Sequence, residues 1–240
     1  MNDTLRRALA EARLRDTDVA TELGVDPKTV QRWLAGRIPH ARHRWGLADM
    51  VGKHENDLWP DLDGAGQPGS AETVAVYPHR GSVPPAVWRG LFGAAREHID
   101  VLVYSGLFLV EDVELMRLIT ARARDGVRVR LAFGDPDSPY VRSRGSEEGI
   151  DDALTAKVRS ALVLCRPLAE TDSVEVRRHA TVLYNSVYRA DDELLVNTHV
   201  YGVGAARAPM LHLRSTGPES LASTYLDSFE RVWAGASPLT

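Results

Sequence analysis

The sequence has a single cysteine, Cys165, so it can form neither an internal disulfide nor a cysteine-based metal cluster. We assign Cys165 no function, because a lone cysteine is often a small buried apolar residue. Long apolar runs are also absent: Val101–Tyr104 and Leu107–Val110 are far shorter than the roughly 20 residues of a membrane span. No positively charged start precedes an apolar stretch, as a secretion signal requires. These absences predict a cytoplasmic protein that does not associate with membranes.

An excess of positive charge is missing too, since 29 Lys and Arg face 33 Asp and Glu. The net charge of −4 argues against a protein that coats nucleic acid along its whole surface. The charges are unevenly spread: residues 1–60 hold ten Lys and Arg against nine Asp and Glu, and the remaining 180 hold 19 against 24. We therefore expect any contact with nucleic acid in the first part of the chain.

Residues 61–70 are dense in Gly, Asp and Pro and have little to bury, which is typical of a linker. Before them come short helical patterns; after them, apolar strand patterns alternate with amphipathic helical ones. The sequence thus predicts an all-α domain in residues 1–62, a linker in 63–72 and an α/β domain with a mixed sheet flanked by helices in 73–240.

The α/β part shows the periodicities of strand and helix in turn, and a turn at residues 190–192 indicates a hairpin. The expected elements are strands at Thr73–Tyr77, Asp100–Ser105, Val127–Phe133, Val174–Arg178, Val182–Arg189, Glu193–His199 and Met210–Arg214, and helices at Pro84–His98, Glu111–Arg124, Asp151–Leu164 and Glu219–Trp233.

Small and apolar residues recur at fixed offsets in the all-α part. Ala20 allows two helices to cross closely, and Gly24 supplies the backbone freedom of a tight turn. Asp26 followed by Pro27 is typical of a helix N-cap and first turn. The inner face of this second helix is expected to bury Val25, Val30 and Trp33. Its outer face would present Lys28, Thr29, Gln31 and Arg32, side chains suited to base edges and phosphates of a major groove.

With this spacing, the segment Leu5–Leu34 resembles the lambda-repressor-like (XRE) helix-turn-helix family, and the resemblance extends toward Trp59. It implies that Pro27–Arg32 belong to the recognition helix, with double-stranded operator DNA as the partner. The basic cluster that follows supplies candidate phosphate contacts: Arg37, His40, Arg42, His43 and Arg44. Because the domain is nearly neutral, one copy would bind weakly, and we expect two copies on a symmetric or repeated site.

The element order from Val101 onward, with the segment Tyr184–His199, resembles one half of a phospholipase D-like domain. That superfamily's signature is His-x-Lys, four residues and Asp, followed by Gly-Ser-x-Asn on the next strand. If Asp191 takes the Asp position, Tyr184 replaces the His and Ser186 the Lys, while Asn197-Thr198 falls about where Gly-Ser belongs.

In a second possible register His179 takes the His position, Thr181 replaces the Lys and Ser186 the Asp. Either register keeps one of three catalytic residues. Because that family uses the His as nucleophile and the Lys to stabilise phosphate charge, we expect no turnover. The resemblance also implies a homodimer, since single-signature members pair their halves across a dimer.

Polar side chains of the hairpin could still line a ligand pocket, and two arginines could add charge at its rim. The candidates are Tyr184, Asn185, Ser186, Tyr188, Asn197 and His199, with Arg142 and Arg144 at the rim. Alternatively, the Tyr and Asn residues of a regular hairpin simply satisfy backbone groups. No His and carboxylate pattern has metal-ligand spacing, so we expect no metal, and nothing in the sequence indicates a cofactor.

These features predict a DNA-binding transcriptional regulator whose catalytically degenerate C-terminal domain dimerises and binds a small polar or anionic effector. Two alternatives stay open. One is a phosphodiesterase or nuclease directed to DNA and using His179 or His199 in an unfamiliar arrangement. The other is an adaptor that recruits a partner protein through the C-terminal domain.

Overall fold

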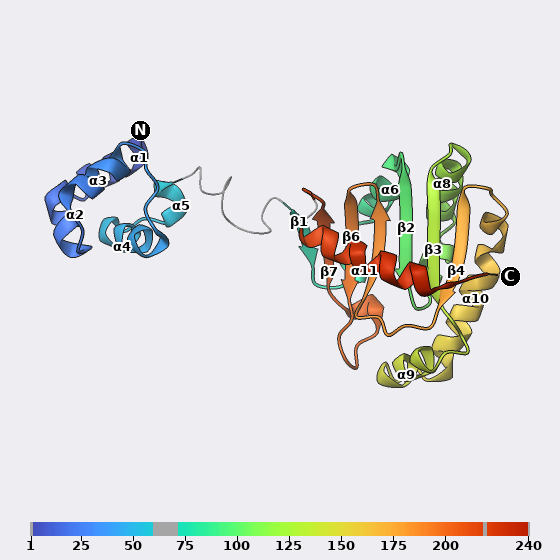
Figure 1. Ribbon diagram of the computed structural model, residues 1–240. Helices are drawn as coiled ribbons and strands as arrows, with labels where there is room; N and C mark the ends of the chain where they lie inside the picture. The colour runs from blue at the N-terminus through green and yellow to red at the C-terminus, as the bar shows by residue number, and fades with distance from the viewer. Residues whose placement is uncertain (1, 60–71, 218–219, 240) are drawn as a thin grey trace. The chain divides into compact units, whose positions relative to one another are not determined.

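The computed structural model describes residues 2–59, 72–217 and 220–239, and the chain divides into two compact units, Met1–Ser70 and Ala71–Thr240 (Figure 1). We call these the first and the second unit. The predicted linker, residues 63–72, lies outside the described residues except for Glu72. Within the described ranges, no helix combines the length and the apolar character needed to cross a membrane.

Within residues 2–59 the first unit consists of short helices joined by turns and loops. Its helices are α1 (Asp3–Glu11), α2 (Asp16–Glu22), α3 (Pro27–Leu34), α4 (Ala41–Val51) and α5 (Glu55–Leu58). Their apolar faces meet in one core that includes Leu5, Val30 and Leu47, each fully buried. Asn2 links α1 to α5. Its side-chain oxygen accepts a hydrogen bond from the Leu5 N–H, and its amide donates to the Leu58 carbonyl.

A mixed sheet forms the centre of the second unit, with the described strands in the order β1-β7-β6-β5-β2-β3-β4-β8. The strands are β1 (Thr73–Tyr77), β2 (His98–Val103), β3 (Arg128–Gly134), β4 (Val174–His179), β5 (Asn185–Ala190), β6 (Glu193–Thr198), β7 (Met210–Arg214) and β8 (Ser237–Pro238). Strands β2, β3 and β4 run parallel, and the other neighbouring pairs are antiparallel. The mixed sheet expected for this part of the chain is confirmed.

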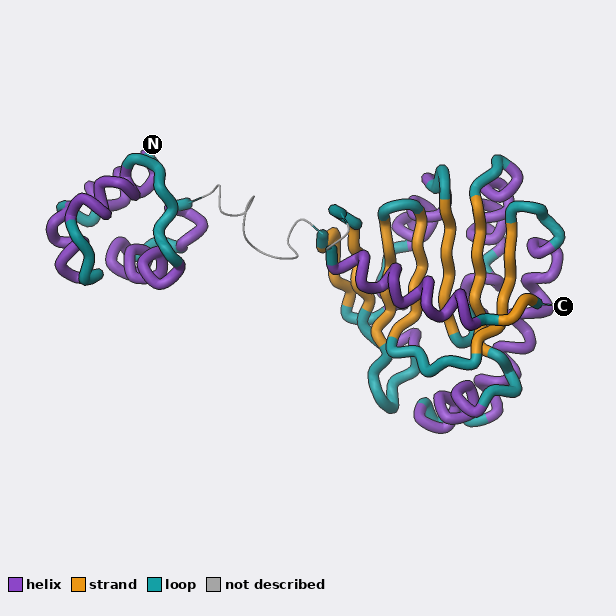
Figure 2. The backbone as a smooth tube through the Cα atoms, in the orientation of Figure 1, coloured by secondary structure: helices purple, strands orange, loops and turns teal. Residues whose placement is uncertain are grey.

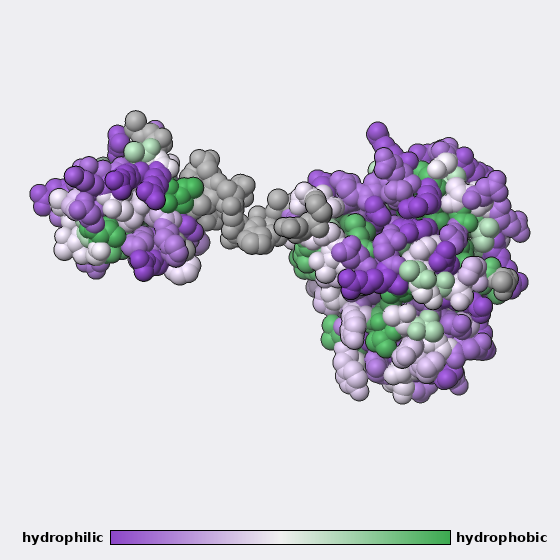
Figure 3. Space-filling model, in the orientation of Figure 1, coloured by the Kyte–Doolittle hydropathy of each residue, from purple (hydrophilic) through white to green (hydrophobic). Residues whose placement is uncertain are grey.

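Helices cover both faces of this sheet (Figures 1 and 2). Helix α11 (Leu221–Gly235) crosses one face, while α6 (Pro85–Ala94) and α8 (Val113–Arg124) lie on the other. The remaining helices are α7 (Leu107–Glu111), α9 (Pro139–Glu147), α10 (Asp152–Ala169) and the short η2 (Arg80–Ser82) and η3 (Ala205–Arg207). Because both faces are covered, the central strand β2 is buried from Ile99 to Val103, and its buried residues are apolar except for Asp100. On the surface drawn in Figure 3, hydrophilic residues predominate and apolar ones are scattered.

Boundaries expected for the first two helices of the second unit were wrong. The helix expected at 84–98 ends at Ala94, and β2 begins at His98, because the Asp191 carboxylate binds the backbone of residues 96–98 in a non-helical conformation. The helix expected from Glu111 begins at Val113, because Asp112 caps it by accepting hydrogen bonds from two backbone N–H groups. The helix α7, which precedes this cap, was not predicted.

Further differences from the expected elements concern α9, α10, β5 and α11. Residues 139–147, for which no element was expected, form α9, and the helix expected at 151–164 continues to Ala169. The first hairpin strand begins at Asn185 instead of Val182. The start predicted for the last helix, Glu219, lies outside the described residues, and α11 is described from Leu221.

Candidate functional site

Helices α2 and α3 are joined by a tight turn, as the sequence predicts. Gly24 has a φ of 64°, a conformation that glycine adopts without strain. Asp26 then caps α3, because its side chain accepts a hydrogen bond from the Lys28 N–H at 2.8 Å. Val30 and Trp33 hold the inner face of α3 in the core, with 0% and 4% exposure. Helix α3 is therefore fixed with one face buried and the other toward solvent.

The outer face of α3 carries the predicted DNA-binding residues. Lys28, Gln31 and Arg32 are exposed, while Thr29 is half-buried. The Gln31 amide donates a hydrogen bond to the Asp16 carboxylate at the start of α2, 3.0 Å away. Among the described residues, no carboxylate lies within ion-pair distance of Lys28 or Arg32. These two cations are therefore available to a partner, and Gln31 becomes available when it leaves Asp16.

The predicted phosphate contacts after α3 differ in their surroundings. Arg37 and Arg42 are exposed, and the Arg42 Nε donates to the His43 ring at 2.9 Å. Arg44 instead forms an ion pair with Glu55 and donates to the Pro39 carbonyl at 2.9 Å. These bonds join α4 to α5, which favours a structural role for Arg44 over a contact with phosphate.

A cavity of about 300 Å³ lies in the second unit where β2 ends. Here β2 has the parallel neighbour β3 on one side and the antiparallel neighbour β5 on the other. Ligands of α/β proteins commonly bind in crevices at the carboxyl ends of strands. Gly106 turns the chain from β2 into the cavity wall α7 with a φ of 58°, and a Cβ there would lie 2.8 Å from Val103. Glycine is therefore required at this corner.

Three of the predicted ligand residues line this cavity: Ser186, Tyr188 and His199. Tyr184 does not, because it precedes β5 and is 80% exposed. Asn185 is half-buried outside the lining. The buried Asn197 donates its amide to the carbonyls of Ala208 and Pro209, at 3.1 and 3.0 Å. For Asn197 the alternative stated above, that a hairpin residue satisfies backbone groups, is confirmed.

The two predicted rim arginines lie outside the lining. Arg142 is exposed on α9 and donates to the Asp137 carbonyl at 2.9 Å, beside a different hollow. Arg144 is buried, pairs with Glu148 at 2.8 Å and donates to the Val203 carbonyl at 2.8 Å. Since Glu148 lines the cavity, Arg144 neutralises an acidic group of its wall.

His199 and Ser186 form a hydrogen-bonded pair in the cavity wall. The His199 Nδ1 lies 3.1 Å from the Leu183 carbonyl, which can only accept, so this nitrogen carries the proton of the neutral ring. Its Nε2 then accepts the Ser186 hydroxyl proton at 3.0 Å. Burial, together with the positive charges of Arg144 and Arg80, lowers the pKa of His199 to about 4. His199 is therefore uncharged at neutral pH.

Lowering the pH from about 6.5 to about 4 is expected to destabilise the second unit through His199. The unfolded chain binds a proton on this ring near pH 6.5, whereas the folded protein binds it near pH 4. The stabilisation is thus fully present above pH 6.5 and falls with the pH, by about 3 kcal/mol across the window. Urea unfolding at a series of pH values should show a shallower decline for His199→Gln than for the wild type; equal slopes would contradict the assignment.

The sequence analysis missed three basic residues of the cavity: Arg80 on η2, Lys157 on α10 and Arg207 on η3. Within the described ranges, none of the three lies within ion-pair distance of a carboxylate. The Arg80 guanidinium instead lies 4.0 Å above the Phe108 ring. No sequence signal could have joined these residues, because they come from three separate segments. The same lining contains Glu111, which has no ion-pair partner among the described residues, so the three cations outnumber the unpaired carboxylate.

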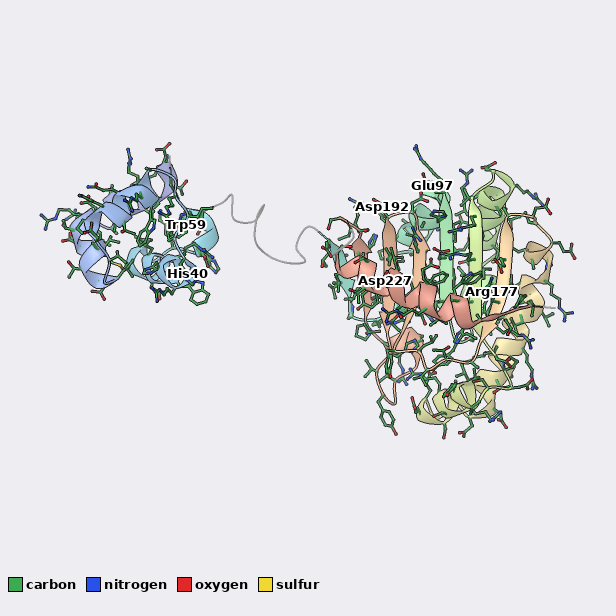
Figure 4. The ribbon with its side chains drawn as sticks, in the orientation of Figure 1. His40, Trp59, Glu97, Arg177, Asp192 and Asp227 are labelled. Carbon is green, nitrogen blue, oxygen red and sulfur yellow. The ribbon has the colours of Figure 1, made fainter. Side chains whose placement is uncertain are left out.

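Asp191, which one register aligns with the catalytic Asp of the phospholipase D-like signature, has hydrogen bonds that indicate a structural role. Its carboxylate accepts hydrogen bonds from the N–H groups of Arg96, Glu97 and His98, at 2.8 to 2.9 Å. Although burial opposes it, these bonds lower the pKa of Asp191. Glu97 and Asp192, labelled in Figure 4, lie beside it, just before the start of β2 and in the turn between β5 and β6. His179 also lies outside the cavity lining: it is buried at the end of β4, and its Nε2 lies 3.0 Å from the Val103 carbonyl.

No family model and no curated protein matches the chain. Among solved structures it is similar to TrmBL2, an archaeal chromatin protein described as showing a novel mode of DNA binding, with 13% identity, a TM-score of 0.47 and coverage of 90% of this chain and 72% of that one. It is also similar to Nuc from Salmonella typhimurium, a phospholipase D family member, with 14% identity, a TM-score of 0.41 and coverage of 69% and 97%. NucT from Helicobacter pylori gives 12% identity, a TM-score of 0.42 and coverage of 69% and 98%. At these identities and TM-scores, function has to be argued from the chain's own residues.

Proposed function

We propose that this protein is a sequence-specific DNA-binding transcriptional regulator of the XRE type, with a second unit that pairs two copies and binds a small anionic effector. The observation that carries the DNA-binding part is the outer face of α3, where Lys28, Gln31 and Arg32 are exposed while Val30 and Trp33 anchor the helix. A helix held in this way fits a major groove, where Gln suits adenine and Arg suits guanine.

Pairing of two copies would supply the affinity that one nearly neutral unit lacks. Large apolar side chains are exposed on the two chain segments that flank the start of β5 and the end of β6: Val182, Tyr184, Val200 and Tyr201. The segments are adjacent, because the His199 N–H donates to the Tyr184 carbonyl at 2.9 Å. Tyr184 and Tyr201 are 80% and 84% exposed, and exposed aromatic residues in a cluster are typical of protein interfaces.

The effector part of the proposal is supported by the cavity. Arg80, Lys157 and Arg207 outnumber the one unpaired carboxylate of the lining, Glu111, and the Ser186–His199 pair adds neutral polar groups. Carboxylate and phosphate groups are the natural partners of such a set. An effector would regulate DNA binding only if it binds the DNA-competent and the incompetent states with different affinities.

A hydrolase, and with it a DNA-directed phosphodiesterase, is the second candidate, favoured by the Ser186–His199 hydrogen bond. This bond joins a hydroxyl to an imidazole nitrogen, as nucleophile and base are joined in serine hydrolases. A pKa of about 4 makes His199 a weak base at neutral pH, which supports the regulator better. The test is hydrolysis of bis(p-nitrophenyl) phosphate and of p-nitrophenyl acetate. If the wild type and His199→Ala both hydrolyse each substrate only at the background rate, this candidate is excluded.

Selection of bound fragments from a genomic DNA library tests the regulator. The full chain is expected to enrich a two-part motif, because two α3 helices would read two half-sites. The Gln31→Ala/Arg32→Ala double variant should lose this enrichment, since each good base contact discriminates by about 1 to 3 kcal/mol. Arg7→Ala, which removes one exposed positive charge from α1, is the control and should keep it. Enrichment retained by the double variant would contradict the placement of the reading helix.

A further inference from the structure

A second cavity, of about 310 Å³, adjoins the first. Both cavities are lined by Arg80, Phe108 and Ala206, so these residues form the wall between them. The second cavity extends away from β2 toward α6 and the start of α8, where Trp88 and Leu115 line it. A single small molecule that lay across Arg80 and Phe108 would contact the lining of both cavities.

The second cavity differs chemically from the first. Its apolar lining includes Val83, Trp88 and Leu115, and the Trp88 ring meets Phe108 edge to face at 5.3 Å. Apart from Arg80 at the boundary, its charged lining residues already have partners. Arg89 and Glu114 form an ion pair at 3.3 Å, and the Asp112 carboxylate caps α8. What this cavity offers a ligand is thus mainly apolar and aromatic surface.

At the boundary, Arg80 combines the positive charge of the first cavity with contact to the aromatic surface of the second. Its guanidinium lies 4.0 Å from the centre of the Phe108 ring, so it faces aromatic surface, and its charge is unpaired among the described residues. A cation on an aromatic face is held weakly enough for an anion to pair with it. An acid group placed there would lie at the cavity whose lining also includes Lys157 and Arg207.

We propose that the two cavities form one bipartite site for an amphiphilic organic anion. Its acid group would pair with Arg80, Lys157 and Arg207, and its apolar or aromatic body would pack against Val83, Trp88 and Leu115. This inference rests on the anion-binding part of the proposed function and adds a requirement for an apolar body. Burial of that body supplies affinity that a bare anion lacks.

Calorimetric titration of the full chain with 4-phenylbutyrate, butyrate and 4-phenylbutan-1-ol separates the two parts of the site. The phenylbutyrate should bind about tenfold or more tightly than either of the others, because only it has both the acid group and the ring. Lys157→Met should weaken both acids about threefold to tenfold and leave the alcohol unchanged. Arg166→Met, which removes an exposed positive charge from the same helix, is the matched control and should change neither.

Filling the second cavity tests the position of the ring. Leu115→Phe should reduce the affinity for 4-phenylbutyrate to that for butyrate, and Val83→Leu fills the same cavity more mildly if the first variant does not fold. Equal affinities for 4-phenylbutyrate and butyrate, or no response to either filling variant, would overturn the bipartite site while a simple anion site remained. No binding of any probe would overturn both, and the library selection would still report separately on DNA binding.

Discussion

An Arg130→Ala variant is expected to lose about 3 kcal/mol or more of unfolding free energy, because it would break a buried ion pair from one side. Asp100 on β2 is fully buried, and Arg130 on β3 donates to it through two nitrogens, at 2.7 and 3.0 Å. The same guanidinium bonds Glu230 of α11 at 2.6 Å and lies 4.6 Å from the Phe229 ring. Its removal would leave Asp100 with Arg189 alone, at 2.8 Å.

Hydrogen bonds within this cluster shift the pKa values of Arg130 and Glu230 toward their charged forms. Burial opposes the charge of Arg130, but the hydrogen bonds to Glu230 and Asp100 outweigh burial and raise its pKa. The same hydrogen bond from Arg130 lowers the pKa of Glu230. Because the cluster ties β2, β3 and α11 together, it also fixes the strand whose end forms the cavity.

Urea unfolding of the full chain measures this effect. Arg128→Ala is the matched control, because it removes an exposed arginine from the same strand and should change stability by about 0.5 kcal/mol or less. Arg130→Met keeps much of the apolar contact with Phe229 and isolates the loss of charge. A loss for Arg130→Ala as small as that for Arg128→Ala would show that Asp100 does not depend on this partner.

Local signals in the sequence were enough to predict α3 and its orientation. A cap, a proline at the helix start and a turn glycine act within a few residues, so Gly24, Asp26 and Pro27 define the start of α3 without help from the rest of the fold. Alternating strand patterns likewise gave most of the sheet. The helix α9 was missed because its sequence has little apolar periodicity; it depends on the Ser138 cap, 3.1 Å from the Tyr140 N–H, and on burial of Val141.

The cavity could be predicted only in part, because its two halves have different origins. Ser186, Tyr188 and His199 share one hairpin, and strand alternation places them together. Alternation failed at Tyr184, since β5 begins one residue later and Tyr184 is left exposed. The cations Arg80, Lys157 and Arg207 come from segments far apart in the chain. Only the tertiary fold, which places η2, α10 and η3 around the end of β2, brings them together.

A chain truncated after Leu62 is expected to bind a DNA fragment selected by the full chain about 100-fold more weakly. If the second unit pairs two copies, binding of one α3 helix raises the local concentration of the other, and truncation removes this gain without removing any contact of α3. Fluorescence anisotropy at one fixed salt concentration measures the change, because phosphate contacts make affinity depend on salt. Circular dichroism checks that the truncated unit keeps its helices, as its separate core implies.

Fusion of the truncated unit to a dimeric coiled coil identifies the cause of the loss. If pairing is what the second unit contributes, the fusion should recover most of the lost affinity, since it restores two reading helices in one molecule. A fusion that stays as weak as the truncated unit would mean that the second unit contacts DNA itself. Undiminished affinity of the truncated unit alone would contradict pairing as a source of affinity, because one nearly neutral helical unit would then suffice to bind the site.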